Sequence, residues 1–503
     1  MAQETAAAVG DGTARRMARG GGLNLVGALC SQSALFIIMS LLAWRLGAAD
    51  VGRYATCYAL LSLLGLLSLA GLRSALTRFT AMHLADNDAG RLRGTIRLGL
   101  GLNLIGSTVI GAGLALAAPA VAAIFDDPAL RSSIILVALT LPASTFEDAA
   151  LATTQGWRSM KAFALIGLIF DPMFRLGLTA AALFLGFGLQ GALIALLTAS
   201  WTGAVIAGFT LRRWLRGVPN APRVYEPRSL FSYSMVSWMS NLAGTGLIWT
   251  ATLMLGAMSS QEQVGIFTVA TRLVTLAVFV MAPINAAFTP HIAHLSHTGD
   301  RTGMSAAYGS ANRWIMRISM PAFILLLVYP EDLLTFFGKD FETGARVTMI
   351  LAVGQMVSAA AGPCGTVLNM SGRVALTMVD NIGALAANIG LNLLLIPVYG
   401  IQGAALSWSV ALTISNLAKA IQVRQLLGVR SAGAGWAKTF LAAAPAFAVA
   451  ALVATRIDGW LPAVLLGLPA ILVTFVGVLA LLGIGAEDTA LLRSALRLVR
   501  GGR

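Results

Sequence analysis

Helix-length apolar runs recur along almost the whole chain, and they constrain its fold more than any other feature. About fourteen can be drawn, each close to the ~20 residues that a helix needs to cross roughly 30 Å of hydrocarbon. They cover residues 23–44, 54–76, 96–117, 133–154, 163–185, 192–211, 235–255, 264–286, 314–329, 347–368, 375–396, 403–421, 439–454 and 462–482. The runs are continuous rather than alternating, which favours helices over barrel strands. The sequence therefore predicts an all-α, polytopic membrane protein.

Composition and charge agree with a membrane body and exclude an ordinary water-soluble protein. Of the 503 residues, 57% are hydrophobic and 11% charged, against roughly 45–50% and about 25% in soluble domains. The net charge of +14 follows topology, because 24 of the 35 Lys and Arg residues fall in cytoplasmic segments when the N-terminus is inside. This asymmetry predicts that both termini are cytoplasmic. The excess of basic residues therefore reflects the orientation of the chain in the membrane, and no nucleic-acid partner is expected.

An internal repeat with a period of about 212 residues relates the two halves of the chain. Gly188-Leu-Gln-Gly-Ala192 matches Gly400-Ile-Gln-Gly-Ala404, and Val51-Gly-Arg-Tyr-Ala55 matches Val264-Gly-Ile-Phe-Thr268. Six spans separate the matched elements, so each copy keeps its orientation in the membrane. We predict two six-helix lobes related by a pseudo-twofold axis along the membrane normal, plus two extra C-terminal helices.

This repeat divides the chain into six predicted segments. They are a cytoplasmic N-terminal segment (1–22), an N-lobe (23–211), a cytoplasmic linker (212–234), a C-lobe (235–421), the two extra helices (439–482) and a basic cytoplasmic tail (483–503).

Charged residues inside the predicted spans must face protein, water or substrate, because each costs at least about 2.5–3.5 kcal/mol at a helix centre. Asp171 and Arg175 lie four residues apart on one helical face and can pair. The two residues could face a substrate site, but a purely structural ion pair explains them equally well. Arg272 has no acid three or four residues away, so its partner must come from another helix or a ligand. The adjacent Glu147 and Asp148 point roughly 100° apart, so they are not expected to face one site.

Further polar side chains mark other places where a wet surface can form. Asp380 begins the eleventh span, and Asn388 and Asn392 follow along it, which fits either a wet face or hydrogen bonding between helices. Gln32 and Asn241 occupy matching places in the first and seventh spans. Their carboxamides can bind sugar hydroxyls or join two helices.

Motifs of enzymes are missing from the sequence. It contains no HExxH helix, no GxSxG elbow and no GxxxxGK[ST] loop. His291, His294 and His297 follow a helical spacing, but no carboxylate or cysteine supports them as metal ligands. We therefore expect no catalytic residue, no metal and no cofactor.

Two stretches carry a resemblance to a known family. They are Leu46-Gly-Ala-Ala-Asp-Val-Gly-Arg-Tyr-Ala55 and Gly71-Leu-Arg-Ser-Ala-Leu-Thr-Arg78. Together with the two repeats and the two extra helices, they resemble the multidrug/oligosaccharidyl-lipid/polysaccharide flippase superfamily, in its polysaccharide biosynthesis branch of O-antigen and exopolysaccharide flippases. The resemblance implies transport of a polyprenyl-diphosphate-linked oligosaccharide from the cytoplasmic to the periplasmic leaflet of a bacterial inner membrane, by alternating access.

The resemblance also gives roles to the polar residues of the spans. A headgroup of diphosphate and sugars needs a wet, partly cationic cavity, for which the candidate cations are Arg45, Arg175 and Arg272. Candidate sugar contacts are Gln32, Asn241, Asn388 and Asn392, and candidate ion-coupling residues are Glu147, Asp148, Asp171 and Asp380. The expected partners are the lipid-linked oligosaccharide, the bilayer, a polysaccharide polymerase and other assembly proteins.

Three other functions fit the same sequence. A flippase for the peptidoglycan lipid precursor also has fourteen helices, and a multidrug or cation antiporter of the same superfamily has the same repeat. A membrane glycosyltransferase, ligase or polymerase would act on the same lipid carrier, but such enzymes generally have a large exterior loop. Every exterior loop predicted here is short.

Overall fold

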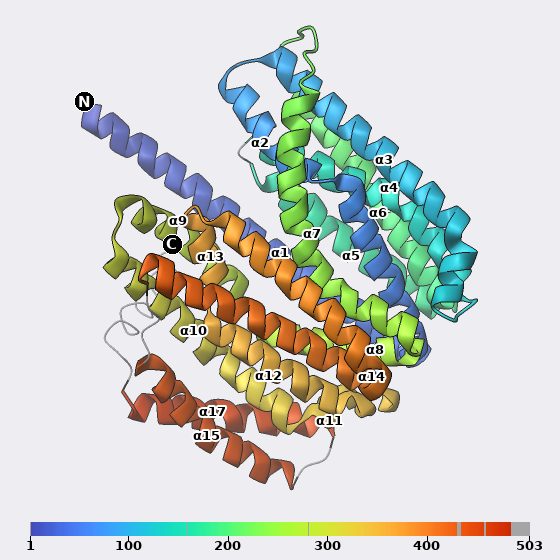
Figure 1. Ribbon diagram of the computed structural model, residues 1–503, viewed down its shortest axis with the longest axis vertical. Helices are drawn as coiled ribbons and strands as arrows, with labels where there is room; N and C mark the ends of the chain where they lie inside the picture. The colour runs from blue at the N-terminus through green and yellow to red at the C-terminus, as the bar shows by residue number, and fades with distance from the viewer. Residues whose placement is uncertain (1, 158, 280, 430–433, 457–458, 484–503) are drawn as a thin grey trace. The chain divides into compact units, whose positions relative to one another are not determined.

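The computed structural model of the chain describes residues 2–157, 159–279, 281–429, 434–456 and 459–483. Within these ranges every regular element is a helix, which confirms the all-α prediction (Figure 1). The predicted basic tail lies outside the described residues, apart from Gly483.

The first half of the chain contains α1 (Ala2–Leu69), α2 (Leu72–Ala85), α3 (Ala89–Ile124), α4 (Leu130–Gln155), η1 (Phe163–Phe170), α5 (Asp171–Phe184), α6 (Gly188–Leu215), α7 (Pro227–Met258) and α8 (Gln261–Ala277). The second half contains α9 (Met281–Thr298), α10 (Arg301–Val328), α11 (Pro330–Thr335), η2 (Lys339–Gly344), α12 (Ala345–Ala361), α13 (Cys364–Met370), α14 (Val374–Leu427), α15 (Ala434–Ala454), α16 (Trp460–Pro462), η3 (Ala463–Gly467) and α17 (Leu468–Leu481).

The number of membrane crossings agrees with the predicted fourteen. Ten helices of the described chain are long and apolar enough to cross a membrane. Two of them contain a sharp non-helical turn, at Gly47 in α1 (φ 80°) and at Gly400 in α14 (φ 54°), so each provides two predicted spans. Glycine permits these positive φ angles because it has no Cβ. The seventh and eighth predicted spans fall on α7 and on α8 with α9.

Three predicted spans are broken where the sequence indicated continuous helices. The second is interrupted at Ala70 and Gly71, which have φ angles of 41° and 76° and separate α1 from α2. The eighth ends at Ala277 and resumes at Met281. The tenth is interrupted at Gly362 and Pro363, where proline cannot donate a backbone hydrogen bond. Apolar composition continues through each break, so hydropathy alone does not reveal it.

Contacts among the described residues divide the chain into two compact units. The first unit extends to Val269 and includes Met378–Ala411, whereas the second contains Ala270–Thr377 and the chain from Leu412 onward. The division differs from the predicted lobes because α7 packs on α1 and α2, which groups it with the N-terminal helices. The two lobes of the predicted repeat therefore stay a prediction.

Matched glycines of the internal repeat meet inside the first unit. A Cβ built on Gly52 of α1 would overlap the carbonyl oxygen of Gln261 and lie 3.0 Å from the backbone nitrogen of Gly265 on α8. Conversely, a Cβ on Gly265 would overlap the carbonyl oxygen of Ala48. Thr56 Oγ1 donates a hydrogen bond of 2.9 Å to Gln261 Oε1 beside this contact. Small residues thus let two equivalent helix segments approach backbone to backbone, as membrane helices commonly do.

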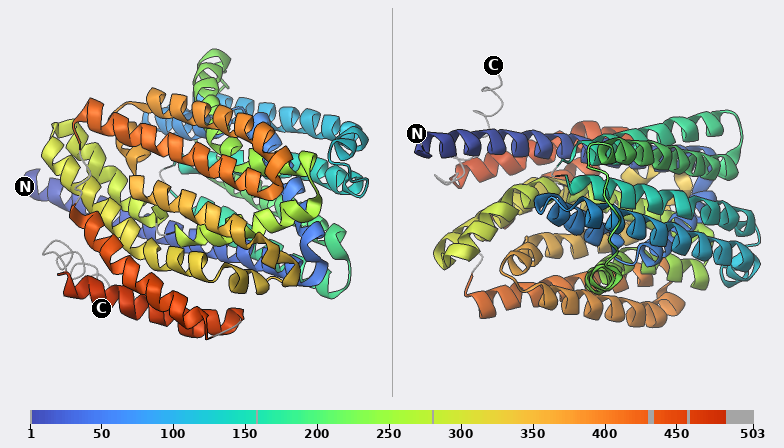
Figure 2. Two further views of the ribbon diagram at one scale, coloured as in Figure 1. Left: turned by 60° about the horizontal axis from the view of Figure 1, so that its bottom comes forward. Right: turned by 90° about the horizontal axis from the view of Figure 1, so that it is seen from above.

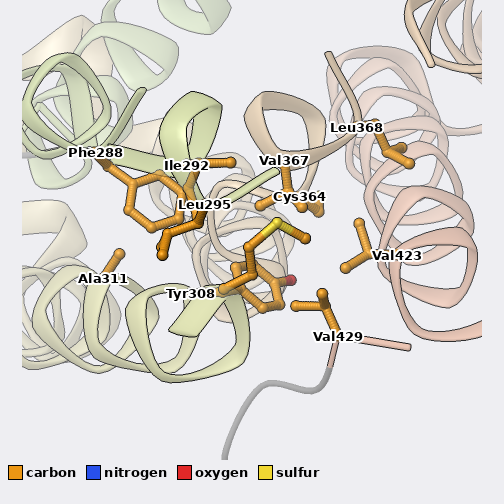
Figure 3. Packing of buried hydrophobic residues seen from close by; sticks show 11 residues of the cluster. Phe288, Ile292, Leu295, Tyr308, Ala311, Cys364, Val367, Leu368, Val423 and Val429 are labelled. Atoms are coloured by element: carbon orange, nitrogen blue, oxygen red, sulfur yellow. The ribbon is translucent and has the colours of Figure 1, made fainter. Parts of the chain in front are cut away.

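In the second unit, a buried apolar cluster joins α9, α10, α13 and α14 (Figure 3). Ile292, Tyr308, Cys364 and Val423 are at most 3% exposed within it. Further along the chain, α15 and α17 lie side by side (Figure 2). Tyr329 Oη ties α15 to the end of α10 by donating a hydrogen bond of 2.8 Å to the carbonyl oxygen of Ala450.

Candidate substrate cavity

A cavity of about 700 Å³ lies inside the first unit, between α1, α2, α4 and α7. Its described wall consists of Tyr58, Leu61, Ser62, Gly65, Leu66, Leu69, Gly71, Arg73, Ser74, Thr77, Arg78, Ser144, Thr145, Asp148, Gln155, Tyr233, Asn241 and Thr245. Most of these side chains are polar, although they belong to an apolar chain. The volume is within the range of about 300–1,000 Å³ that is usual for ligand sites.

Hydrogen bonds and a close backbone contact fix the four helices around the cavity. Trp238 Nε1 on α7 donates to the carbonyl oxygen of Leu66 on α1 at 3.1 Å. Thr77 Oγ1 on α2 donates to the carbonyl oxygen of Ala152 on α4 at 2.8 Å. A Cβ on Gly71 would overlap the carbonyl oxygen of Ser234, so glycine is needed where α2 begins against α7. The break between α1 and α2 thereby directs the polar face of α2 into the cavity.

Two arginines of α2 supply positive charge to the wall. The guanidinium carbon of Arg78 lies 4.5 Å from the ring centroid of Tyr233, and that of Arg73 lies 5.5 Å from the ring centroid of Phe163. Stacking on an aromatic ring orients a guanidinium without using its N–H donors. These planar donors match the oxygens of a phosphate group.

Asp148 provides the acid of the described wall, and its neighbour Glu147 points elsewhere. A Cβ on Gly203 of α6 would come within 2.6 Å of the carboxyl carbon of Glu147, so this side chain packs against α6. Glu147 is 7% exposed. With two arginines and one aspartate, the described wall has a net formal charge of +1.

The remaining polar lining can bind a neutral, hydroxyl-rich ligand. Hydroxyl groups come from serine, threonine and tyrosine side chains on all four helices, and amides come from Gln155 and Asn241. Hydroxyls both donate and accept, and an amide offers one acceptor and two donor hydrogens. A phosphate and a sugar can therefore be accommodated in the same cavity.

Arg175 lies behind this wall and does not form the expected ion pair. It is 4% exposed, and its guanidinium carbon lies 5.6 Å from the ring centroid of Tyr58, which lines the cavity. Among the described residues, no ion pair within 4 Å joins Arg175 to Asp171. Helical spacing put both residues on one face, but the aromatic ring on α1 provides the contact to the cation.

The other predicted site residues lie at several different places. Arg45 is exposed, with its guanidinium carbon 4.6 Å from the ring centroid of Phe184, and Gln32 is half-buried in α1 outside the described cavity wall. Asn388 and Asn392 are 0% exposed, and Asn392 Nδ2 donates to Asn388 Oδ1 at 3.1 Å, so in this conformation they bind one another.

Asp380 is half-buried near the start of α14, and Arg272 is half-buried in the part of α8 that belongs to the second unit. Of the eleven residues predicted for the site, Asp148 and Asn241 line the cavity of the first unit. Within the part of the chain that the structure describes, no group of three His, Cys, Asp or Glu side chains gathers as metal ligands would.

Sequence reasoning missed Arg73, Arg78, Tyr58 and Tyr233 as members of a site. A signal for the arginines was present, since both belong to the stretch Gly71–Arg78 and Arg73 is a charge inside a predicted span. No signal indicated the tyrosines, because their role depends on which helices pack together.

Comparison with known protein families identifies the class to which this fold belongs. The model of the polysaccharide biosynthesis protein family matches residues 17–296, which is more than half of the chain, and the MatE model matches residues 237–394. The chain belongs to the polysaccharide biosynthesis protein family, and hence to the multidrug/oligosaccharidyl-lipid/polysaccharide superfamily. The family matches confirm the predicted superfamily. The chain is a multi-pass membrane protein.

Two curated relatives come from Haloferax volcanii. The "Probable low-salt glycan biosynthesis flippase Agl15" is 24% identical over 213 residues, which are 42% of this chain and 44% of the relative. The "Probable flippase AglR" is 27% identical over 197 residues, which are 38% of this chain and 40% of the relative. The chain thus aligns with about two fifths of the length of each.

Solved structures share the fold over most of the chain. "Lipid II flippase MurJ, inward closed conformation" has a TM-score of 0.60 and 14% identity, covering 90% of this chain and 97% of that one. An inward-facing multidrug resistance MATE family transporter has a TM-score of 0.64 and 14% identity, covering 80% of this chain and 98% of that one. At this identity the likeness concerns the fold alone.

Proposed function

We propose that this protein is a flippase that moves a polyprenyl-diphosphate-linked oligosaccharide from the cytoplasmic to the periplasmic leaflet for O-antigen or exopolysaccharide synthesis. The observation that carries the proposal is the polar cavity of the first unit, with two ring-stacked arginines in a chain of the polysaccharide biosynthesis family. The names of the two curated relatives, both probable flippases, support it. The protein acts by alternating access and has no catalytic residue.

The physical task is to shield a charged, hydroxyl-rich headgroup while its polyprenyl tail stays in lipid. Burying unpaired charges in hydrocarbon is prohibitively costly, so the transporter must provide compensating groups. Arg73 and Arg78 are placed to neutralise the diphosphate, and Asn241 and the hydroxyls of the wall can bind the sugars. Arg175 adds positive potential from behind Tyr58.

Other parts of the transport cycle follow from the remaining charges. Arg45 and Arg272 are further candidate phosphate contacts, and Gln32, Asn388 and Asn392 become sugar contacts if other conformations expose them. Proton exchange at Glu147, Asp148, Asp171 or Asp380 can drive the cycle, as can the membrane potential acting on the cargo. The protein acts in the bacterial inner membrane with both termini cytoplasmic, beside a polysaccharide polymerase and other assembly proteins.

Deletion of the gene followed by a leaflet assay tests this function directly. Without the flippase, the lipid-linked oligosaccharide should accumulate on the cytoplasmic side. A glycosidase or lectin that is added on the periplasmic side cannot reach it there. Accumulation on the periplasmic side would contradict the proposal, because it would indicate a ligase or polymerase. Complementation with the Arg73→Gln variant, compared with Arg213→Gln as a cationic control outside the cavity, connects the phenotype to the cavity.

A second candidate, a multidrug or cation antiporter, is favoured by the MatE match over residues 237–394. The net positive wall opposes it, since an organic cation would be repelled from a site lined by two arginines and one acid. Proteoliposomes with an imposed proton or sodium gradient distinguish the two: a flippase leaves a fluorescent organic cation in place, whereas an antiporter moves it.

Rescue of a strain that lacks its peptidoglycan precursor flippase would assign that lipid as the cargo instead.

A further inference from the structure

A groove on the outside of the first unit lies over α3, α4 and α6, which are neighbours in the fold (Figure 1). Two adjoining hollows of about 360 and 400 Å³ form it and share Leu104 and Phe146. The first hollow contains Trp201, Val205, Phe209 and Arg212, and the second contains Arg97 and Arg223. The groove is separate from the substrate cavity, with which it shares no lining residue.

Most of the groove wall is apolar and exposed. Trp201, Val205 and Phe209 recur every four residues along α6, with 48%, 52% and 66% of their surface exposed. Glycines leave the space between the side chains: a Cβ on Gly208 would touch Phe146 at 3.4 Å, and a Cβ on Gly101 would meet no atom within 4 Å. The wall is therefore hollowed as well as apolar, which fits a hydrocarbon chain.

One end of the groove is strongly cationic. Arg97, Arg212 and Arg223 are exposed there, and the described lining of both hollows contains no carboxylate. Arg93 is engaged with the chain itself, because its guanidinium donates to the carbonyl oxygens of Leu215, Val218 and Pro219 at 2.9 to 3.3 Å.

The segment that carries Arg223 is held in place beside α3. The backbone nitrogen of Val224 donates to the carbonyl oxygen of Gly90 at 3.1 Å, and Arg91 forms an ion pair of 3.0 Å with Glu226. A Cβ on Gly94 would come within 2.6 Å of the carbonyl carbon of Val224, so the segment lies directly on the helix backbone. Arg223 is thereby fixed at the same end of the groove as Arg97.

The dimensions of the groove match one leaflet of a bilayer. Arg212 and Trp201 are eleven residues apart on α6, which is about 16 Å along a helix. Half of the hydrocarbon thickness is about 15 Å. The arginines therefore lie at the level of lipid headgroups when the apolar wall spans a single leaflet.

We propose that this groove binds one anionic phospholipid. Its phosphate would lie against Arg97, Arg212 and Arg223, and an acyl chain would follow Leu104, Phe146 and the exposed face of α6. Guanidinium donors bind phosphate oxygens by charge-assisted hydrogen bonds, and basic residues at the membrane surface select anionic lipids. The apolar length distinguishes a lipid from free phosphate, and the absence of acids from the described lining distinguishes an anionic headgroup from a zwitterionic one.

Native mass spectrometry of the purified full chain tests the selectivity, using phosphatidylglycerol and phosphatidylcholine with identical acyl chains. The wild type should retain phosphatidylglycerol at about tenfold or more lower lipid concentration. Arg97→Gln combined with Arg223→Gln should remove most of this preference, whereas Arg213→Gln, next to a groove residue but outside the lining, should keep it. Equal retention of the two lipids, or an equal loss in the Arg213→Gln control, would overturn the proposal.

A groove-filling pair tests the position of the acyl chain. Gly101→Leu places a side chain in the second hollow, and Gly113→Leu adds the same side chain to the same helix outside it, where a Cβ also meets open space. Retention of phosphatidylglycerol should fall for Gly101→Leu alone. Displacement of the lipid by millimolar inorganic phosphate would instead identify a phosphate site. Displacement by a polyprenyl phosphate, with no effect of excess phosphatidylglycerol, would assign the groove to the cargo tail.

Discussion

The contact between Gly52 and Gly265 can be tested by adding one methyl group. In Gly52→Ala the new Cβ would lie 2.7 Å from the carbonyl carbon of Gln261 and overlap its oxygen. Carbon atoms in good contact are about 3.5–4.0 Å apart. The segments of α1 and α8 would therefore have to separate by more than 1 Å, mainly to relieve the overlap with this oxygen, and that movement also strains the buried hydrogen bond between Thr56 and Gln261.

Overpacking of this kind costs about 1–3 kcal/mol, and a lost buried hydrogen bond costs about 1 kcal/mol more. Alanine regains about 0.5–1 kcal/mol of helix propensity over glycine. We expect Gly52→Ala to lower the free energy of unfolding by about 2–3 kcal/mol, measured by equilibrium unfolding in mixed micelles with tryptophan fluorescence.

Gly113→Ala is the matched control, because its Cβ would meet no atom within 4 Å, and it should leave stability unchanged or slightly raised. Gly52→Ala combined with Gly265→Ala should cost less than the two single variants together, since both open the same contact. If Gly52→Ala unfolds like the Gly113→Ala control, the backbone contact between the matched segments does not exist.

Three further outcomes are expected from single substitutions and from pH. Arg73→Gln should slow flipping in proteoliposomes by about tenfold or more while Arg73→Lys recovers part of the rate, because the charge contacts phosphate; wild-type flux in Arg73→Gln would remove it from the site. Arg272→Ala should abolish transport without abolishing membrane insertion, and unchanged flux would exclude it. His83 Nε2 lies 3.2 Å from Thr95 Oγ1, and burial lowers the pKa of this imidazole below its ordinary value. The unfolded chain therefore binds a proton at His83 more readily, so the free energy of unfolding should fall as pH drops below about 6.5. His83→Gln should remove that part of the pH dependence seen in unfolding, and an identical pH profile would contradict it.

The sequence alone was sufficient for the fold class, the number of spans and the family. These properties depend on local composition, because hydrocarbon offers no partner for backbone groups and a long, continuous apolar run satisfies its own backbone groups by forming a helix. The repeat was also visible in the sequence, since Val51-Gly52 and Val264-Gly265 share their neighbours. That the two glycines touch was not predictable, because it requires two helices 213 residues apart to pack together.

The cavity was decided by tertiary structure. Sequence reasoning identified charges inside the membrane, but the direction of each side chain depends on how its helix is rotated and what lies opposite. Arg78 faces the cavity because the chain breaks at Gly71 and Tyr233 of α7 packs over its guanidinium. Asn388 and Asn392 are as polar as any residue of the cavity wall, yet they are turned inward and bind one another. Hydropathy depends on residues that are adjacent in sequence. A binding site is formed by residues that are distant in sequence, and only the packing of the helices brings them together.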